Sequence, residues 1–223
     1  WPTGMTQISG GGSQTAAIGV GGYPPSSVST VNEFDGSTWT GGTSYPTNIR
    51  GADAGGPSTT DSYCGGGEIV NTGTNAFNLY DGTNWTAGAA NPATNFNKFC
   101  GLQNATLAVD NGPGATQTFD GSTWTSGNSA LATNQTNMYG NQAAAVNACA
   151  NPSGNIPAQE WDGTCWASGG TPSNPGFSGR GTVQTGTTGW FSGAYPTSAP
   201  PTSSNVVEEY SMSGEATKTI TTS

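Results

Sequence analysis

The chain has 223 residues, of which 32% are hydrophobic and 8% are charged, with 36 glycines and 14 prolines. A net charge of −9 with only 4 basic residues argues against nucleic acid or an anionic membrane surface as a partner. No apolar run reaches the ~18 residues of a membrane-spanning helix, so no membrane insertion is expected.

In chain order, each predicted unit opens with an extended piece, such as "MTQISGGG", followed by a short strand of small residues, such as "TAAIGVGG" (15–22). An octet then recurs at 33–40, 79–86, 118–125 and 160–167, beginning with "EFDGSTWT". Asp-Gly between β-prone flanks is typical of a hairpin turn. The third strand is therefore expected to end at an aromatic residue (Phe34, Tyr80, Phe119, Trp161), and the fourth to begin at a tryptophan (Trp39, Trp85, Trp124, Trp166).

The tryptophans recur about every 40–45 residues, which is typical of propeller blades or long helical repeats. The abundant Gly, Pro, Ser and Thr form helices poorly, so helical repeats are excluded. The sequence predicts an all-β fold: a β-propeller of four-stranded blades forming a single domain over residues 1–223. Five units are expected, at approximately 4–41, 48–87, 95–126, 136–168 and 177–223.

The ends of the repeat array differ from its middle. The fifth unit keeps Glu209 and Tyr210 but lacks the Asp-Gly-x-x-Trp part, which is typical of a terminal repeat, so Ser223 is expected near the natural C-terminus. The chain starts at Trp1 without an initiator Met, so further blades or a shaft are an open alternative upstream of it.

The recurring aromatic residues and glycines have an expected structural role. Blades of Gly, Ala and Thr bury little by themselves, so the aromatic pair of each octet is expected to fill the seam between blades. Glycines in the inner strands are expected to let the blades approach the central axis closely.

Several motifs resemble known repeats. Gly21-Gly22 followed by Phe34 and Trp39, and Gly66-Gly67 followed by Tyr80 and Trp85, resemble kelch repeats. The stretches "QTAAIGVGG" (14–22), "TNIRGADAGG" (47–56) and "YDGTNWT" (80–86) are similar to the kelch-like repeat proteins of marine bacteriophages. The resemblance implies a virion appendage such as a tail fibre, head fibre or decoration protein.

Ligand contacts are expected on one end of the propeller. The connections between the second and third strands and those between blades share that end, and they are long and varied, whereas the Asp-Gly turns lie at the other end. Three Tyr-Pro pairs fall in the long loops and mark Tyr23, Tyr45 and Tyr195 as candidate binding residues. The alternative is that these pairs only stiffen the loops.

Three basic residues, Arg50, Lys98 and Arg180, are expected near the start of first strands. They could form a basic ring for an anionic group. The favoured alternative is pairing with local carboxylates such as Asp53.

No catalytic site, metal or cofactor is predicted. The four octet aspartates and the glycines after them are interpreted as turn residues, because all are repeat-equivalent; they are Asp35, Asp81, Asp120 and Asp162 with Gly36, Gly82, Gly121 and Gly163. The chain has no His, which removes Ser-His triads and His-ligated metals. The protein is therefore predicted not to be an enzyme.

The four cysteines, Cys64, Cys100, Cys149 and Cys165, show no C-x-x-C spacing. Mostly buried thiols are expected, and one disulfide is left open.

The function expected is that of a non-enzymatic virion component on the particle surface, used for host recognition or adhesion. Its expected partners are other virion proteins and a host glycan or protein, and a homo-oligomer is left open. The alternatives are a secreted or cell-surface lectin-like propeller and a purely structural virion spacer.

Overall fold

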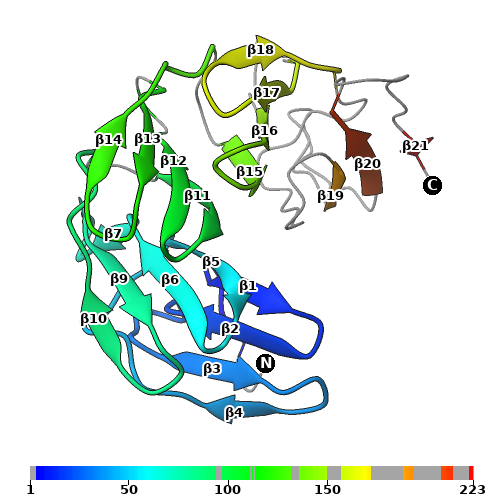
Figure 1. Ribbon diagram of the computed structural model, residues 1–223. Helices are drawn as coiled ribbons and strands as arrows, with labels where there is room; N and C mark the ends of the chain where they lie inside the picture. Colours follow the sequence, from blue (N-terminus) through cyan, green and yellow to red (C-terminus); the bar gives the residue numbers. More distant parts are fainter. Residues whose placement is uncertain are drawn as a thin grey trace. The chain divides into compact units, whose positions relative to one another are not determined.

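The computed structural model describes residues 4–93, 97–110, 112, 114–131, 136–149, 157–171, 188–192, 207–212 and 221–222 (Figure 1). These residues form strands and connecting loops. Within them, no helix is long and apolar enough to cross a membrane.

Four sheets have four strands each, and each lies within one of the predicted units. The first sheet contains β1 (Ser9–Ser13), β2 (Ala16–Val20), β3 (Val31–Phe34) and β4 (Trp39–Gly41). The second contains β5 (Asp53–Ser58), β6 (Asp61–Gly65), β9 (Phe77–Tyr80) and β10 (Trp85–Ala87). The third contains β11 (Lys98–Leu102), β12 (Ala105–Val109), β13 (Thr116–Phe119) and β14 (Trp124–Ser126). The fourth contains β15 (Thr136–Gly140), β16 (Ala145–Cys149), β17 (Gln159–Trp161) and β18 (Trp166–Ser168).

Two smaller sheets complete the described strands. One has the order β19 (Thr188–Ser192), β20 (Val207–Ser211), β21 (Thr221–Thr222), and the other is a hairpin of β7 (Glu68–Ile69) and β8 (Thr72–Gly73). Neighbouring strands are consecutive within each sheet apart from this inserted hairpin, and the pairings in the first, second and fourth sheets are antiparallel.

The strand ends predicted from the octet are confirmed. In all four sheets the third strand ends at the aromatic residue before Asp-Gly, and the fourth begins at the tryptophan. In the first sheet these residues pair directly across the ladder, Phe34 with Trp39. Their rings lie 5.1 Å apart, so the aromatic pair closes the hairpin.

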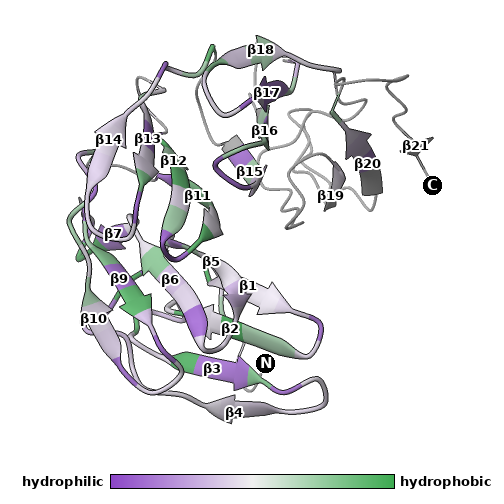
Figure 2. Ribbon diagram, viewed as in Figure 1, coloured by the Kyte–Doolittle hydropathy of each residue, from purple (hydrophilic) through white to green (hydrophobic). Residues whose placement is uncertain are grey.

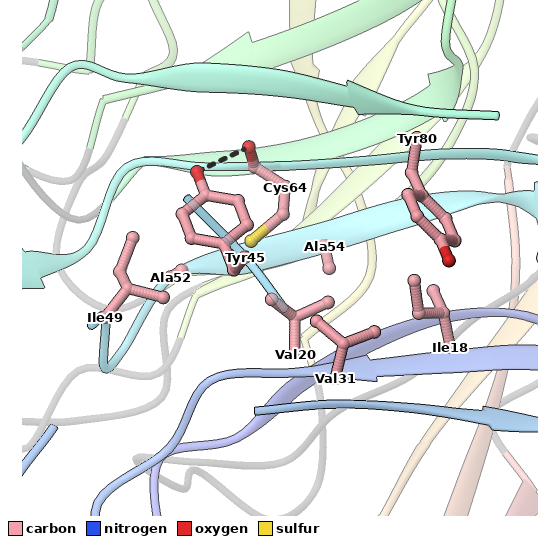
Figure 3. Packing of buried hydrophobic residues seen from close by; sticks show 9 residues of the cluster. All are labelled: Ile18, Val20, Val31, Tyr45, Ile49, Ala52, Ala54, Cys64 and Tyr80. Atoms are coloured by element: carbon pink, nitrogen blue, oxygen red, sulfur yellow. Dashed lines mark hydrogen bonds between the residues drawn. The ribbon is translucent and has the colours of Figure 1, made fainter. Parts of the chain in front are cut away.

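The chain divides into two compact units, one of residues 1–108 and 119–125 and the other of residues 109–118 and 126–223. In the first unit, one core cluster joins β2 and β3 to β5, β6 and β9; it contains Ile18, Val20, Val31, Tyr45, Ile49, Ala52, Ala54, Cys64 and Tyr80 (Figure 3). A second cluster there is largely aromatic, with Tyr63, Phe77, Phe99 and Phe119 around Ala108. The second unit has a cluster of Tyr139, Val146, Ala158 and Tyr210.

Hydropathy follows this layering. In Figure 2 the hydrophobic colour lies on parts of strands such as β2, β6 and β12, whereas β4 and β14 are pale. Because β4 is an outer strand of its sheet, its Thr40 and Gly41 are exposed.

Glycine allows the first strands of neighbouring sheets to touch in the first unit. A Cβ built on Gly11 of β1 would lie 2.6 Å from the Cα of Gly55 in β5, so two backbones meet where no side chain fits. The Ser9 hydroxyl also accepts a hydrogen bond of 2.6 Å from the Ala54 N–H. These contacts agree with the predicted use of inner-strand glycines.

The opening tryptophans also bridge neighbouring sheets, as predicted. Trp85 of the second sheet donates its indole N–H to the Thr43 carbonyl oxygen at 2.9 Å, in the linker that follows the first sheet. Trp124 does the same toward Ala89 at 2.9 Å, in the linker that follows the second sheet. In the second unit Trp166 donates to the Thr116 hydroxyl at 2.8 Å.

Within each unit, the two kinds of loop lie where the sequence predicts. Loops between second and third strands bond to the loops between sheets. In the first unit Val28 bridges to Ile49 and Arg50 bridges to Glu68. In the second unit Ala130 donates to the Gly114 carbonyl at 2.9 Å. Each Asp-Gly turn instead lies against the turn between the first two strands of its own sheet, as Gly36 does against Thr15 and Gly163 against Ala143. These two ends are here named the long-loop end and the tight-turn end.

Candidate functional site

The four octet aspartates, at the tight-turn ends of the two units, hold the backbone of their own turns. One carboxylate oxygen of each accepts two backbone N–H groups, from the residues two and three positions later, at 2.7–2.8 Å. The glycine after each aspartate has a positive φ of 93–97°. These contacts give all four residues the same local task.

The same hydrogen bonds set the charge of these aspartates. Backbone N–H donors lower the pKa of Asp35, Asp81, Asp120 and Asp162 below the ordinary value, so each is ionised at neutral pH. A carboxyl that serves as a general acid needs a raised pKa instead. The interpretation of these residues as turn residues therefore agrees with their geometry.

At the long-loop end, two of the predicted binding residues come together. The Arg50 guanidinium lies over the Tyr23 ring, with 4.7 Å between the guanidinium carbon and the ring centroid. Its Nε and one Nη donate to Glu68 Oε2 at 2.9 and 2.7 Å, and the same Nη donates to Asn71 Oδ1 at 2.5 Å. We name this group of four residues the Arg50 cluster.

The Arg50 cluster is only partly buried, since the Arg50 and Glu68 side chains keep 19% and 21% of their surface exposed. Three elements contribute to it: Tyr23 from the loop after β2, Arg50 from the linker before β5, and Glu68 with Asn71 from the β7–β8 hairpin. It is therefore assembled from loops of two neighbouring sheets, at a place that solvent reaches.

Backbone strain collects around the same cluster. Gln7, Val70 and Asn71 are the non-glycine residues with positive φ in the part of the chain that the structure describes, at 56, 48 and 63°. The Gln7 carbonyl accepts the N–H of Gly51, next to Arg50, while Val70 and Asn71 form the tip of the β7–β8 hairpin. A β-branched residue such as Val70 rarely adopts this conformation, and strain of this kind often accompanies function.

The prediction for Tyr45 is corrected. Tyr45 is 2% exposed and belongs to the core cluster of the first unit, where its hydroxyl donates to the Cys64 carbonyl at 3.2 Å (Figure 3). The same hydroxyl accepts a hydrogen bond of 2.6 Å from the Asn78 amide. Tyr45 cannot touch a ligand. Trp85 packs edge-on against this buried ring, with 4.9 Å between the two ring centroids.

The other candidate residues differ in their surroundings. Arg50 does pair with a carboxylate, but with Glu68 rather than Asp53, whose side chain accepts the Phe99 N–H at 2.8 Å. Lys98 begins β11 and is partly buried. Tyr195 and Arg180 lie outside the described residues, so the basic ring stays a prediction.

Three cysteines are free thiols: Cys64 and Cys100 are buried and Cys165 is exposed. Burial raises the pKa of Cys64 and Cys100 well above the ordinary value, so both are protonated at neutral pH. The side chain of Cys149 lies outside the described part. Among the described residues no group of three or more His, Cys, Asp or Glu side chains could hold a metal ion.

The sequence analysis does not single out Glu68, Val70 or Asn71, which fall in one of the long loops between second and third strands. The signal available was the short run Glu68-Ile69-Val70-Asn71-Thr72, in which an Asn sits between two β-branched residues. Asn tolerates positive φ, so this pattern favours a small hairpin. Nothing in the sequence indicates that its Glu68 would reach Arg50.

No family model and no curated protein matches the chain. The chain is similar in structure to YjhT, with a TM-score of 0.73 and 12% sequence identity over 97% of this chain and 85% of that one. YjhT has a β-propeller-like structure. Together with the four-stranded sheets, this likeness shows a β-propeller-like all-β fold.

Proposed function

We propose that the chain is a non-enzymatic recognition module on the surface of a phage particle, which adheres to a host cell through its long-loop end. The observation that carries this proposal is the Arg50 cluster: an accessible group of polar and aromatic side chains, held by strained backbone on a rigid β scaffold. The tight-turn end offers four nearly identical turns instead, which give a ligand little to discriminate.

The particle setting rests on the resemblance of the repeat motifs to phage kelch-like proteins. A ring of five blades is part of the same proposal, since the sequence holds five repeat units. An experimental structure in which Trp39, Trp85, Trp124 and Trp166 fail to superpose by rotation about one axis would contradict the ring.

Adhesion is tested by adsorption of the purified protein, and of particles that carry it, to host cells. A double variant with Tyr23→Ala and Val70→Asp should abolish adsorption. The matched control, a double variant with Thr83→Ala and Ser122→Ala in the tight turns, should leave adsorption unchanged. Both variants need an intact circular dichroism spectrum. Adsorption lost only in the control pair would assign recognition to the tight-turn end.

The particle setting is tested separately by mass spectrometry of purified particles. Absence of the chain from particles, with adsorption retained, would favour a secreted or cell-surface lectin-like propeller. Presence in particles without any adsorption would favour a structural spacer. Affinity per copy is expected to be weak, and many copies on one particle could raise it by about 10²–10⁴.

A further inference from the structure

We infer that the Arg50 cluster binds a neutral glycan by gripping two adjacent hydroxyl groups between the guanidinium of Arg50 and the carboxylate of Glu68, with Val70 against the apolar face of the sugar. This inference rests on the proposed function, because it names the ligand that the long-loop end would recognise.

The hydrogen-bonding capacity of the ion pair is only partly used. Arg50 contacts Glu68 through Nε and Nη2, and both bonds end on Oε2. Within the described residues, the second Nη of Arg50 and the Oε1 of Glu68 have no hydrogen-bond partner, and neither has the Tyr23 hydroxyl. A donor edge and an acceptor oxygen are therefore left on the same ion pair.

Two neighbouring hydroxyls of a sugar match that arrangement. One hydroxyl can accept a hydrogen bond from the second Nη of Arg50, and an adjacent hydroxyl can donate one to Oε1 of Glu68, since a hydroxyl both donates and accepts. The Tyr23 ring beneath the Arg50 guanidinium and Asn71 beside it fix the plane of that group. The Arg50 side chain therefore loses little rotamer freedom when a ligand binds.

The charge of the site favours a neutral ligand over an anionic one. Arg50 is already neutralised by Glu68 at 2.7 Å, so the pair carries no net charge. The chain as a whole carries −9, which repels polyanions at a distance. An acidic sugar would have to compete with Glu68 for the same guanidinium.

Val70 supplies the apolar contact. It is 79% exposed at the tip of the β7–β8 hairpin, directly before Asn71, which Arg50 holds. Its φ of 48° suits Asn or Gly better than a β-branched residue, so local stability does not explain its presence. A C–H face of a pyranose ring offers such a side chain a surface to cover.

The test is a glycan array carrying neutral and acidic glycans, followed by titration of the best neutral glycan. The wild-type chain should bind neutral glycans with adjacent free hydroxyls. Glu68→Gln and Arg50→Lys should each weaken this binding at least about tenfold, because each removes a hydrogen bond to a charged group. The control Thr83→Ala should bind as the wild type does.

Val70→Asn keeps the inference falsifiable if the ion-pair variants fold poorly. It should raise the melting temperature, because Asn accepts the positive φ, and yet weaken glycan binding several-fold. Full binding by Val70→Asn, full binding by Arg50→Lys, or binding of acidic glycans alone would overturn the inference. An array on which no glycan binds the chain would also overturn the inference. If adsorption to host cells persists in that case, the proposed function still stands.

Discussion

Tyr23 and Tyr45 sit in identical Tyr-Pro dipeptides and have different tasks. Tyr23 stacks under Arg50 with part of its surface exposed, whereas Tyr45 is buried and hydrogen-bonded at both the donor and the acceptor side of its hydroxyl. The difference arises from the neighbours that other sheets bring, Arg50 in one case and Trp85 in the other.

Tyr45→Phe tests the structural task. Removing the hydroxyl leaves the buried Asn78 amide without this acceptor and the Cys64 carbonyl without this donor, so the free energy of unfolding should fall by about 1–3 kcal/mol. Urea unfolding measures this loss. Tyr23→Phe serves as the control and should change stability by less than about 0.5 kcal/mol, since its hydroxyl makes no hydrogen bond in the described part of the chain.

The octet aspartates should titrate in an order set by their donors. Besides two backbone N–H groups, Asp35 and Asp120 each accept two hydroxyl hydrogen bonds from Ser and Thr, so their pKa values should lie below those of Asp81 and Asp162. Carboxyl carbon shifts in an NMR pH titration give the order. Because the folded pKa values are depressed, their contribution to stability is present above about pH 4 and disappears as the pH falls through the folded values. An unshifted Asp35 would contradict the turn geometry.

At the scale of the strands, glycine has different meanings on inner and outer strands. Gly11 of β1 faces the backbone of Gly55 in the next sheet, whereas a Cβ on Gly41 of β4 would meet nothing within 4 Å. The first position is closed by a neighbouring sheet, and the second faces solvent.

Gly11→Ala should therefore destabilise the protein by about 3 kcal/mol or more, because two strands must separate to admit the methyl group. Gly41→Ala is the matched control and should be neutral or stabilising by up to about 1 kcal/mol. Thermal unfolding of both variants measures the contrast. Equal effects would mean that the close approach of β1 and β5 is absent in solution.

At the same scale, hydrogen bonds from tyrosine to glutamate link neighbouring sheets. The Tyr80 hydroxyl donates to Glu33 in the first unit, and the Tyr210 hydroxyl donates to Glu160 in the second. Glu33 directly precedes Phe34 at the end of β3, and Glu160 directly precedes Trp161 at the end of β17. In the second sheet the residue before the last aromatic residue of the third strand is Leu79 and not a glutamate. The third strand of the next sheet accordingly ends with Phe119, which has no hydroxyl to donate.

A double-mutant cycle of Glu33→Gln and Tyr80→Phe should give a coupling of about 0.5–3 kcal/mol between the two residues. Urea unfolding of the two single variants and the double variant supplies the four corners of the cycle. A cycle of Leu79→Ala and Tyr80→Phe is the control. Changes in the free energy of unfolding that simply add in the Glu33–Tyr80 cycle would contradict a shared hydrogen bond.

At the scale of the whole molecule, tyrosine makes up much of the buried material, with Tyr45, Tyr63, Tyr80, Tyr139 and Tyr210 all buried. Burial raises the pKa of each, and with the Glu33 carboxylate it raises that of Tyr80 to about 12. In the unfolded chain the tyrosine hydroxyls ionise near pH 10. The stability that the buried, protonated tyrosines contribute is therefore fully present below that pH.

Stability should therefore fall as the pH rises above about 10, and unfolding should coincide with the absorbance change of tyrosinate at 295 nm. Circular dichroism and absorbance followed together against pH measure this. Tyrosines that ionise gradually near pH 10 while the fold persists would contradict their burial in both units.

The sequence by itself determined the tight turns of the four-stranded sheets, but not the β7–β8 hairpin. The octet marks where third strands end and fourth strands begin, because Asp and Gly set local backbone geometry that depends on few distant contacts. The same local chemistry identified the aspartates as turn residues. It also placed the long loops at one end of each unit, since alternation of strand direction fixes on which end each connection lies.

Only the tertiary structure decided which loop side chains meet. Tyr45 lies in the core, and Glu68 and Asn71 are the partners of Arg50. Each outcome depends on a residue 18 to 21 positions away, whose approach no local pattern encodes. The accessible cluster at the long-loop end exists because packing of neighbouring sheets brings the loop after β2, the linker before β5 and the β7–β8 hairpin within hydrogen-bonding and stacking distance.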